Sequence, residues 1–157
     1  MPTRTSEGPV WQDDWYRPAI ALASPHCDPR PADAQTDLIV VHSISLPPGQ
    51  YGGDEVAALF LGTLDCASHP YFERLRGLRV SAHFFVRRSG AVAQFVGCDQ
   101  RAWHAGESHY RGRNRCNDDS IGIELEGLEG EAFEPAQYAA LTRLCQALAQ
   151  RYPIAFV

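Results

Sequence analysis

The sequence lacks the features of a membrane-spanning or exported chain. No apolar run approaches the roughly 18 residues that are needed to cross a bilayer. Residues 1–25 carry acidic side chains where a secretory signal peptide needs an apolar core. We therefore expect a protein of the cytoplasm.

The sequence also lacks a disulfide framework and the common catalytic motifs. It has no C-x-x-C pair, H-E-x-x-H, P-loop, G-x-G-x-x-G or G-x-S-x-G. An odd number of scattered cysteines is typical of reduced thiols. Nothing places a thiol beside an imidazole, which disfavours a cysteine nucleophile. The cysteines are Cys27, Cys66, Cys98, Cys116 and Cys145.

The composition is that of one soluble globular domain. The chain has 157 residues, of which 45% are hydrophobic and 21% are charged, and its net charge is -5. An acidic chain of this kind is not attracted to nucleic acid or to an anionic membrane. We expect neither as a partner, and we expect a monomer.

Several segments have the patterns of regular structure. Asp54 and Gly62 have the residue types that begin and end a helix, and Pro153 ends the last helix. Residues 1–36 show no sustained period, and residues 97–119 read as a long polar loop of the functional kind. We expect strands at 19–23, 37–43 and 120–127, a hairpin at 79–96, and helices at 54–62, 69–77 and 134–152, the last with apolar positions 138, 141, 144, 145, 148 and 152.

Two polar residues in predicted strands are candidates for chemistry. His42 ends a buried strand next to a Gly/Pro-rich loop, where α/β proteins often present site residues. Glu124 and Glu126 share one face of the 120–127 strand, and Gly122 on the same face indicates close approach by a ligand or another backbone. Taken alone, such a histidine is more often structural, and such glutamates more often form a solvated face.

The 101–115 segment is basic in an acidic protein. Four arginines face a single acid, Glu107, and this pattern indicates either a solvated surface or a clamp for substrate carboxylates. Trp103 and His104 add a flat platform with a polar flank, as a sugar or peptide groove needs. The arginines are Arg101, Arg111, Arg113 and Arg115.

Read in order, these segments resemble one known family. "VVHSISLPPGQYGG", "HPYFERLRGLRVSAHFFVRRSGAVAQFV" and "RAWHAGESHYRGRNRCNDDSIGIELEG" closely resemble the cytoplasmic anhydro-N-acetylmuramoyl-L-alanine amidases of the AmpD type. These zinc amidases share a fold with peptidoglycan recognition proteins and phage T7 lysozyme. The resemblance runs from about residue 24 to residue 152.

The resemblance implies a fold, a reaction and a cofactor. The fold is a single α/β domain with a mixed central sheet flanked by helices. The reaction is zinc-dependent hydrolysis of the amide between anhydro-N-acetylmuramic acid and L-alanine, a step of cell-wall recycling that also removes muropeptides that induce β-lactamase. We expect residues 1–23 to form an irregular arm and residues 24–157 the amidase domain.

The resemblance also assigns roles to individual residues. His42 matches the first zinc ligand of the family, and Glu124 matches its catalytic carboxylate, whereas Glu126 does not. Arg115 is the better candidate for the carboxylates of a diaminopimelate end. The expected substrate-binding residues are Trp103, His104, Arg115, Arg79 and Ser43, the last at a position where relatives commonly have Asn.

One departure from the family concerns the metal. The second zinc ligand, a histidine in a Gly-His turn, and the third, an aspartate in a Lys-x-Asp-Pro-Gly stretch, have no match here. We expect a domain truncated at its C-terminus, with 153–157 as the start of a strand and with little amidase activity. His83 or His104 as substitute ligands are disfavoured. A non-catalytic muropeptide-binding module and a destabilised remnant are the alternatives.

Overall fold

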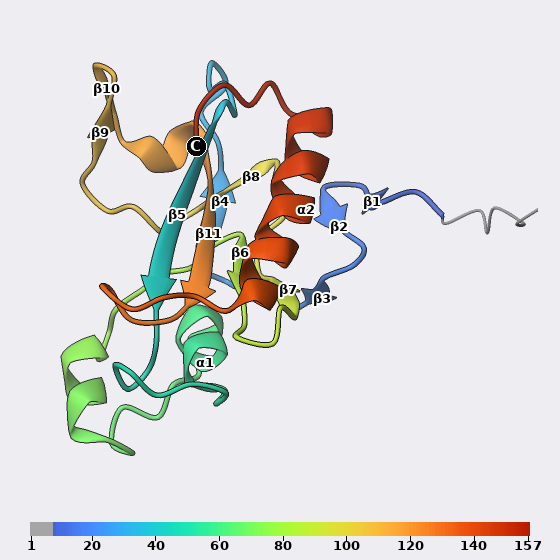
Figure 1. The fold of residues 1–157 in the computed structure, drawn as a ribbon. Coiled ribbons are helices and arrows are strands. Elements are labelled where there is room, and N and C mark those ends of the chain that lie inside the picture. Colours follow the sequence, from blue (N-terminus) through green and yellow to red (C-terminus); the bar gives the residue numbers. More distant parts are fainter. Residues whose placement is uncertain (1–7) are drawn as a thin grey trace, which may run out of the picture.

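The computed structural model describes residues 8–157 and is built around a mixed five-stranded sheet (Figure 1). The sheet order is β3-β7-β6-β11-β5, and only the β6–β7 pair is antiparallel. Helices pack against this sheet in one domain, as predicted. In sheet order the strands are Ile20–Ala21 (β3), Val92–Gln94 (β7), Phe84–Val86 (β6), Ser120–Glu126 (β11) and Leu38–Ile44 (β5).

The central strand β11 pairs with both β5 and β6. It pairs along its whole length with β5, and all seven of its residues are buried. Ile121, Ile123 and Leu125 lie in one core, as the alternation predicts. The opposite face, with Glu124 and Glu126, is buried too, so this strand has no solvated side.

Two cores lie on opposite sides of the sheet. The long helix α2 (Pro135–Arg151) runs along one side (Figure 1) and supplies Leu144 and Leu148. The short helix α1 (Glu55–Leu61) and a 3-10 helix at Pro70–Leu75 lie near the carboxyl ends of β5 and β11. These ends are where open α/β sheets bind ligands.

The helix predictions hold, with one correction on the buried face of α2. Tyr138, expected in the apolar stripe, is 52% exposed. Gln137 is fully buried instead, and its side-chain amide donates to the carbonyls of Val86 and Glu126 at 3.2 and 2.9 Å. The buried position thus supplies a donor to two carbonyls at the ends of β6 and β11, which a buried backbone group requires.

Two stretches expected to be irregular contain short strands. A hairpin of β1 (Trp11–Gln12) and β2 (Trp15–Tyr16) packs the Tyr16 ring against Phe84 in the core. The boundary that we expect at residue 24 stays a prediction, and residues 1–7 lie outside the described part. The 97–119 segment contains β8 (Gln100–Ala102), β9 (His109–Tyr110), β10 (Arg113–Asn114) and a 3-10 turn at Cys116–Asp118. Its strand β8 pairs with β4 (Cys27–Pro29), which lies in the first stretch.

Residues after Pro153 lie beside the edge of β5. Phe156 forms a parallel bridge with Leu38, and the Ile39 N–H donates to the Phe156 carbonyl at 2.9 Å. The Ala155 N–H donates to the Asp37 carbonyl at 2.8 Å. The predicted start of a strand is present here as a single bridge.

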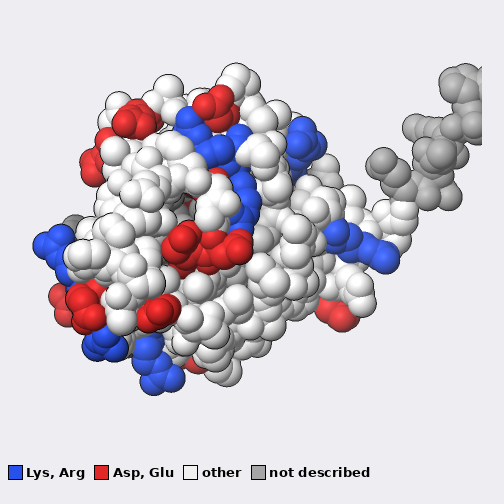
Figure 2. Space-filling model, turned by 90° about the horizontal axis from the view of Figure 1, so that it is seen from below, with Lys and Arg blue, Asp and Glu red and all other residues white. Residues whose placement is uncertain are grey.

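Charges of both signs are interspersed on the surface below the sheet. Figure 2 shows acidic and basic side chains next to one another on this face. Arg87 pairs with Asp54 at 3.3 Å, and Arg88 pairs with Glu134 at 2.6 Å. Of the helices in residues 8–157, none combines the length and the hydropathy that a membrane crossing requires.

Candidate active site

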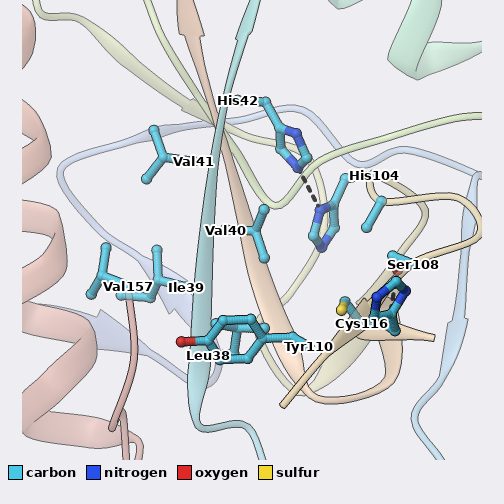
Figure 3. Close-up of a pocket in the computed structure, with 12 residues that line it drawn as sticks. Leu38, Ile39, Val40, Val41, His42, His104, Ser108, Tyr110, Cys116 and Val157 are labelled. Atoms are coloured by element: carbon cyan, nitrogen blue, oxygen red, sulfur yellow. Dashed lines mark hydrogen bonds between the residues drawn. The ribbon is translucent and has the colours of Figure 1, made fainter. Parts of the chain in front are cut away.

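The strand register brings His42 and Glu124 together. They are paired positions on the parallel strands β5 and β11, so their side chains leave the same face of the sheet. The His42 Nε2 lies 2.9 Å from Nδ1 of His104, which comes from the loop after β8 (Figure 3). Burial lowers the pKa of both imidazoles below the ordinary value, so both are neutral at pH 7.

Gly122 provides the space that the His104 ring occupies. A Cβ at position 122 would collide with ring atoms of His104. On its other side the ring places Nε2 at 3.0 Å from the buried Ser120 hydroxyl. The close approach predicted at Gly122 is therefore real, and the group that approaches is an imidazole of the chain itself.

Glu124 is a buried carboxylate with one oxygen that accepts no hydrogen bond from the described residues. Its side chain is only 8% exposed, and among residues 8–157 no group bonds to its Oε2. Burial raises its pKa to about 8, because the charged form loses solvation. It lines a groove of about 370 Å³ together with Ser43, Trp103 and His104.

Glu126 has a structural function on the same strand. Its two carboxylate oxygens accept the backbone N–H groups of Gly52 and Arg88 at 2.6 and 2.9 Å. These bonds hold the loop after β5 and the hairpin turn against the end of β11. Of the two glutamates, only Glu124 has a buried carboxylate oxygen without a hydrogen bond among the described residues.

Trp103 forms a fixed platform in the wall of the groove. Its ring stacks on His26 at a centroid distance of 6.1 Å and an angle of 12°. Its Nε1–H donates to Asp28 at 3.0 Å. The indole is thus held at its face and its edge, which suits a surface against which a sugar or peptide packs.

The predicted basic surface is largely neutralised within the fold. Arg101 pairs with Asp28 and Asp118, and Arg113 pairs with Asp37. These aspartates lie outside residues 101–115, in β4 and in the segments before β5 and β11. The charge balance of the 101–115 segment alone therefore does not include them. The guanidinium of Arg111 lies over the ring of Phe156. Of the four arginines, Arg101 and Arg113 are thus paired with carboxylates from outside the 101–115 segment.

Two expected substrate contacts lie away from Glu124. The Arg115 side chain is 70% exposed and pairs with Asp118 at 3.0 Å. Arg79 lines a separate hollow of about 250 Å³ beside His26, which shares Leu59 and other wall residues with the groove. The structure thus gathers Ser43, Trp103, His104 and Glu124 in one groove and leaves the two arginines outside it.

His83 is fully engaged in the core. Its Nδ1 accepts the Gly122 N–H at 3.1 Å, so its proton is on Nε2, which lies 2.9 Å from the Gln100 carbonyl. Burial, with the nearby Arg30 charge, lowers its pKa to about 3. With both nitrogens bonded, His83 has no lone pair left for a metal.

The chemistry of His42 suits zinc, but a complete ligand set is not present. A catalytic zinc uses about three protein ligands. Within residues 8–157 no group of three His, Cys, Asp or Glu side chains is placed to hold a metal. These residues by themselves therefore do not form the site that the resemblance implies.

Comparison with known proteins assigns the chain and its fold to a family. A sequence profile described as N-acetylmuramoyl-L-alanine amidase matches residues 32–156. The chain belongs to the N-acetylmuramoyl-L-alanine amidase family. Within this family it is similar to the 1,6-anhydro-N-acetylmuramyl-L-alanine amidase AmpD of Citrobacter freundii, with 53% identity over 90% of the chain and 75% of the relative. AmpD of Haemophilus influenzae is 47% identical over 84% of the chain and 72% of the relative.

Solved structures agree with this membership. The amidase-family chain superposes on a crystal structure of an AmpD selenomethionine derivative with a TM-score of 0.88 and 53% identity, covering 90% of this chain and 79% of that one. It shares its fold with the Drosophila peptidoglycan recognition protein SA at a TM-score of 0.53 and 18% identity, over 83% and 66% of the two chains. The predicted fold and family are confirmed.

Proposed function

We propose that this protein hydrolyses the amide between the lactyl group of anhydro-N-acetylmuramic acid and the L-alanine of a muropeptide. The names of the AmpD relatives support this substrate. An Escherichia coli relative, AmiD, was solved with anhydro-N-acetylmuramic acid-L-Ala-D-γ-Glu-L-Lys. The observation that carries the proposal is the buried carboxylate of Glu124, which has an oxygen without a hydrogen bond among residues 8–157 and which belongs to a residue that lines the groove beside Trp103.

Glu124 is suited to move the proton that the reaction requires. A water oxygen attacks the amide carbonyl carbon, and the carboxylate takes the proton that this water loses. The same proton then passes to the L-alanine nitrogen as the C–N bond breaks. A group whose pKa lies near the working pH is able to do both. A cation bound nearby would lower this pKa, because it favours the carboxylate.

Trp103 and the flanking residues would bind the substrate. We propose that the sugar or the start of the peptide packs on the indole, with Ser43 and His104 beside it in the groove. Arg115 would bind the carboxylates of the diaminopimelate end after leaving Asp118, and Arg79 would contact the peptide from the neighbouring hollow.

Zinc is the cofactor that the family resemblance implies, with His42 as one ligand. We expect the polypeptide of residues 1–157 to bind zinc weakly, because no group of three donors converges among its described residues. Equilibrium dialysis should show weak binding that the His42→Ala substitution weakens further. Tight stoichiometric binding that survives this substitution would contradict both the expected weakness and the role of His42.

The reaction is tested by identifying its products. Incubation of anhydro-N-acetylmuramoyl-L-Ala-γ-D-Glu-diaminopimelate with the zinc-supplied protein should release anhydro-N-acetylmuramic acid and the intact tripeptide, as detected by mass spectrometry. Cleavage should be slow for residues 1–157 and slower still after Glu124→Gln. The control Glu129→Gln alters an exposed carboxylate of the same groove and should leave the rate unchanged. Rapid turnover by a protein of this intact mass, or cleavage at another bond, would contradict the proposal.

A non-catalytic muropeptide-binding module is the second candidate. It is favoured by an intact groove beside which no three donors converge among residues 8–157. Calorimetric titration with and without a chelator separates the two functions. Unchanged affinity without any hydrolysis indicates the binding module, and no affinity under either condition argues against both candidates.

Under either function, the Trp103→Ala variant should bind the muropeptide at least about 30-fold more weakly, as expected for a central aromatic contact worth roughly 2 kcal/mol. Trp15→Ala removes the same ring from β2, outside the groove, and should leave the affinity unchanged. Equal affinities of the two variants would show that the ligand does not use the Trp103 platform.

We further propose a cytoplasmic protein that acts in cell-wall recycling as a monomer. All five cysteines are free thiols, as expected in a reducing compartment. Its action would remove the muropeptides that induce β-lactamase in species that have this response. The amidase domain is proposed to span residues 24–157.

A further inference from the structure

A row of three polar side chains runs from the core to His42. The Ser120 hydroxyl lies 3.0 Å from His104 Nε2, and His104 Nδ1 lies 2.9 Å from His42 Nε2. Ser120 is completely buried, whereas His104 and His42 are both partly exposed and line the pocket in Figure 3. The middle imidazole is thus bonded at both nitrogens to groups of its own chain.

Several contacts hold the middle imidazole, that of His104, in place. The Gly122 backbone lies against one side of its ring and leaves no room for a Cβ. The backbone N–H groups of His104 and Ala105 both donate to Asn117 Oδ1, at 3.1 and 2.9 Å. His104 therefore cannot turn its ring or shift without disturbing β11 or the turn at Asn117.

The proton between the two imidazoles has two possible places. Each neutral imidazole has one donor and one acceptor nitrogen. If His104 Nδ1 carries its ring proton, it donates to the lone pair of His42 Nε2. The ring proton of His42 must then be on His42 Nδ1. If His42 Nε2 carries the proton, the His42 Nδ1 keeps a free lone pair, and the His104 Nε2–H donates to Ser120.

We propose that His104 is a positioning residue that accepts the Nε2–H of His42 and so leaves the Nδ1 lone pair of His42 free. The choice between the two arrangements rests on the proposed function, in which His42 is a ligand and needs that lone pair. Residues that bind metals through one imidazole nitrogen are commonly oriented by a hydrogen bond at the other. His104 therefore acts through His42, and its contact with substrate is secondary.

The position of this proton is tested by nitrogen-15 NMR of histidine-labelled, metal-free protein at pH 8. We expect a one-bond proton–nitrogen correlation from His42 Nε2 and an unprotonated His42 Nδ1. A proton on His104 Nδ1 would overturn the proposal. The wild-type spectrum alone decides this point, and neither zinc nor substrate is needed, so failure of the proposed amidase function would not affect the result.

Variants test whether His104 is the cause. In His104→Ala the His42 Nε2–H should exchange with water and its signal should disappear, and Gly122→Ala should do the same by displacing the ring. In His104→Asn an amide oxygen near the former Nδ1 position should restore the signal. An unchanged His42 signal in His104→Ala would overturn the proposal, even if Gly122→Ala fails to fold.

Discussion

The Glu124→Gln variant is expected to lose activity and gain stability. The loss should be about 10²- to 10⁴-fold in the rate of amide hydrolysis, the usual contribution of a general acid–base group. The gain follows from burial, which raises the pKa of Glu124 from an ordinary 4.5 to about 8 in the folded protein. A group that serves the reaction thus works against the stability of the fold.

The direction of the pH effect follows from this difference in pKa. Between pH 4.5 and pH 8 the unfolded chain has released the proton of this carboxyl while the folded chain retains it. Wild-type stability therefore falls as pH rises through this range. Glutamine does not titrate, so the stability advantage of Glu124→Gln should grow by about 3 kcal/mol between pH 5 and pH 7.5.

Urea unfolding of metal-free protein at several pH values measures this effect. The matched control Glu129→Gln removes a carboxylate that is already in water, so its stability difference from wild type should stay constant with pH. A Glu124→Gln difference that also stays constant would show that the folded protein does not hold Glu124 in the environment described above.

The second large effect is expected at Arg30, which is a partly buried cation without a carboxylate partner among residues 8–157. Its guanidinium donates to the carbonyls of Cys98, Asn117, Asp118 and Ser120 at distances from 2.8 to 3.3 Å. Burial lowers its pKa from the ordinary value. It thereby joins the segment after β7, the turn before β11 and the first residue of β11.

Arg30→Met should destabilise the protein by about 3 kcal/mol, because several buried carbonyls lose their donors at once. For a chain of this size that corresponds to a fall of roughly 6–12 °C in Tm. The control Arg76→Met removes a guanidinium that pairs with Glu73 on the surface and should change stability by less than about 1 kcal/mol. Equal effects of the two variants in thermal unfolding would contradict the account of Arg30.

The regular elements could be predicted because their signals are local. The strand at Leu38–Ile44 begins with the apolar run Leu38–Val41, and α1 begins after Asp54 and is followed by Gly62, as predicted. The faces of β11 followed from simple alternation. The burial of Gln137 was not predicted. Its amide donates to two strand carbonyls that come within reach only when α2 packs on the sheet.

The site was predictable in its residue types but not in its contacts. Nothing local distinguishes Glu124 from Glu126, whose difference comes from the distant N–H groups of Gly52 and Arg88. Gly122 gave a correct signal of close approach, yet its partner His104 lies in another segment. Long-range partners of this kind are fixed by the tertiary fold and leave no periodic trace in the sequence.

The central claim is that the scissile amide binds in the groove between Trp103 and Glu124. A crystal structure of the Glu124→Gln variant with anhydro-N-acetylmuramoyl-tripeptide tests it most directly. We predict that the lactyl–alanine amide lies within hydrogen-bonding reach of the side chain at position 124, with the ligand packed on the Trp103 ring. A ligand bound instead along the edge of β5, beside Tyr110 and Val157, would contradict the account.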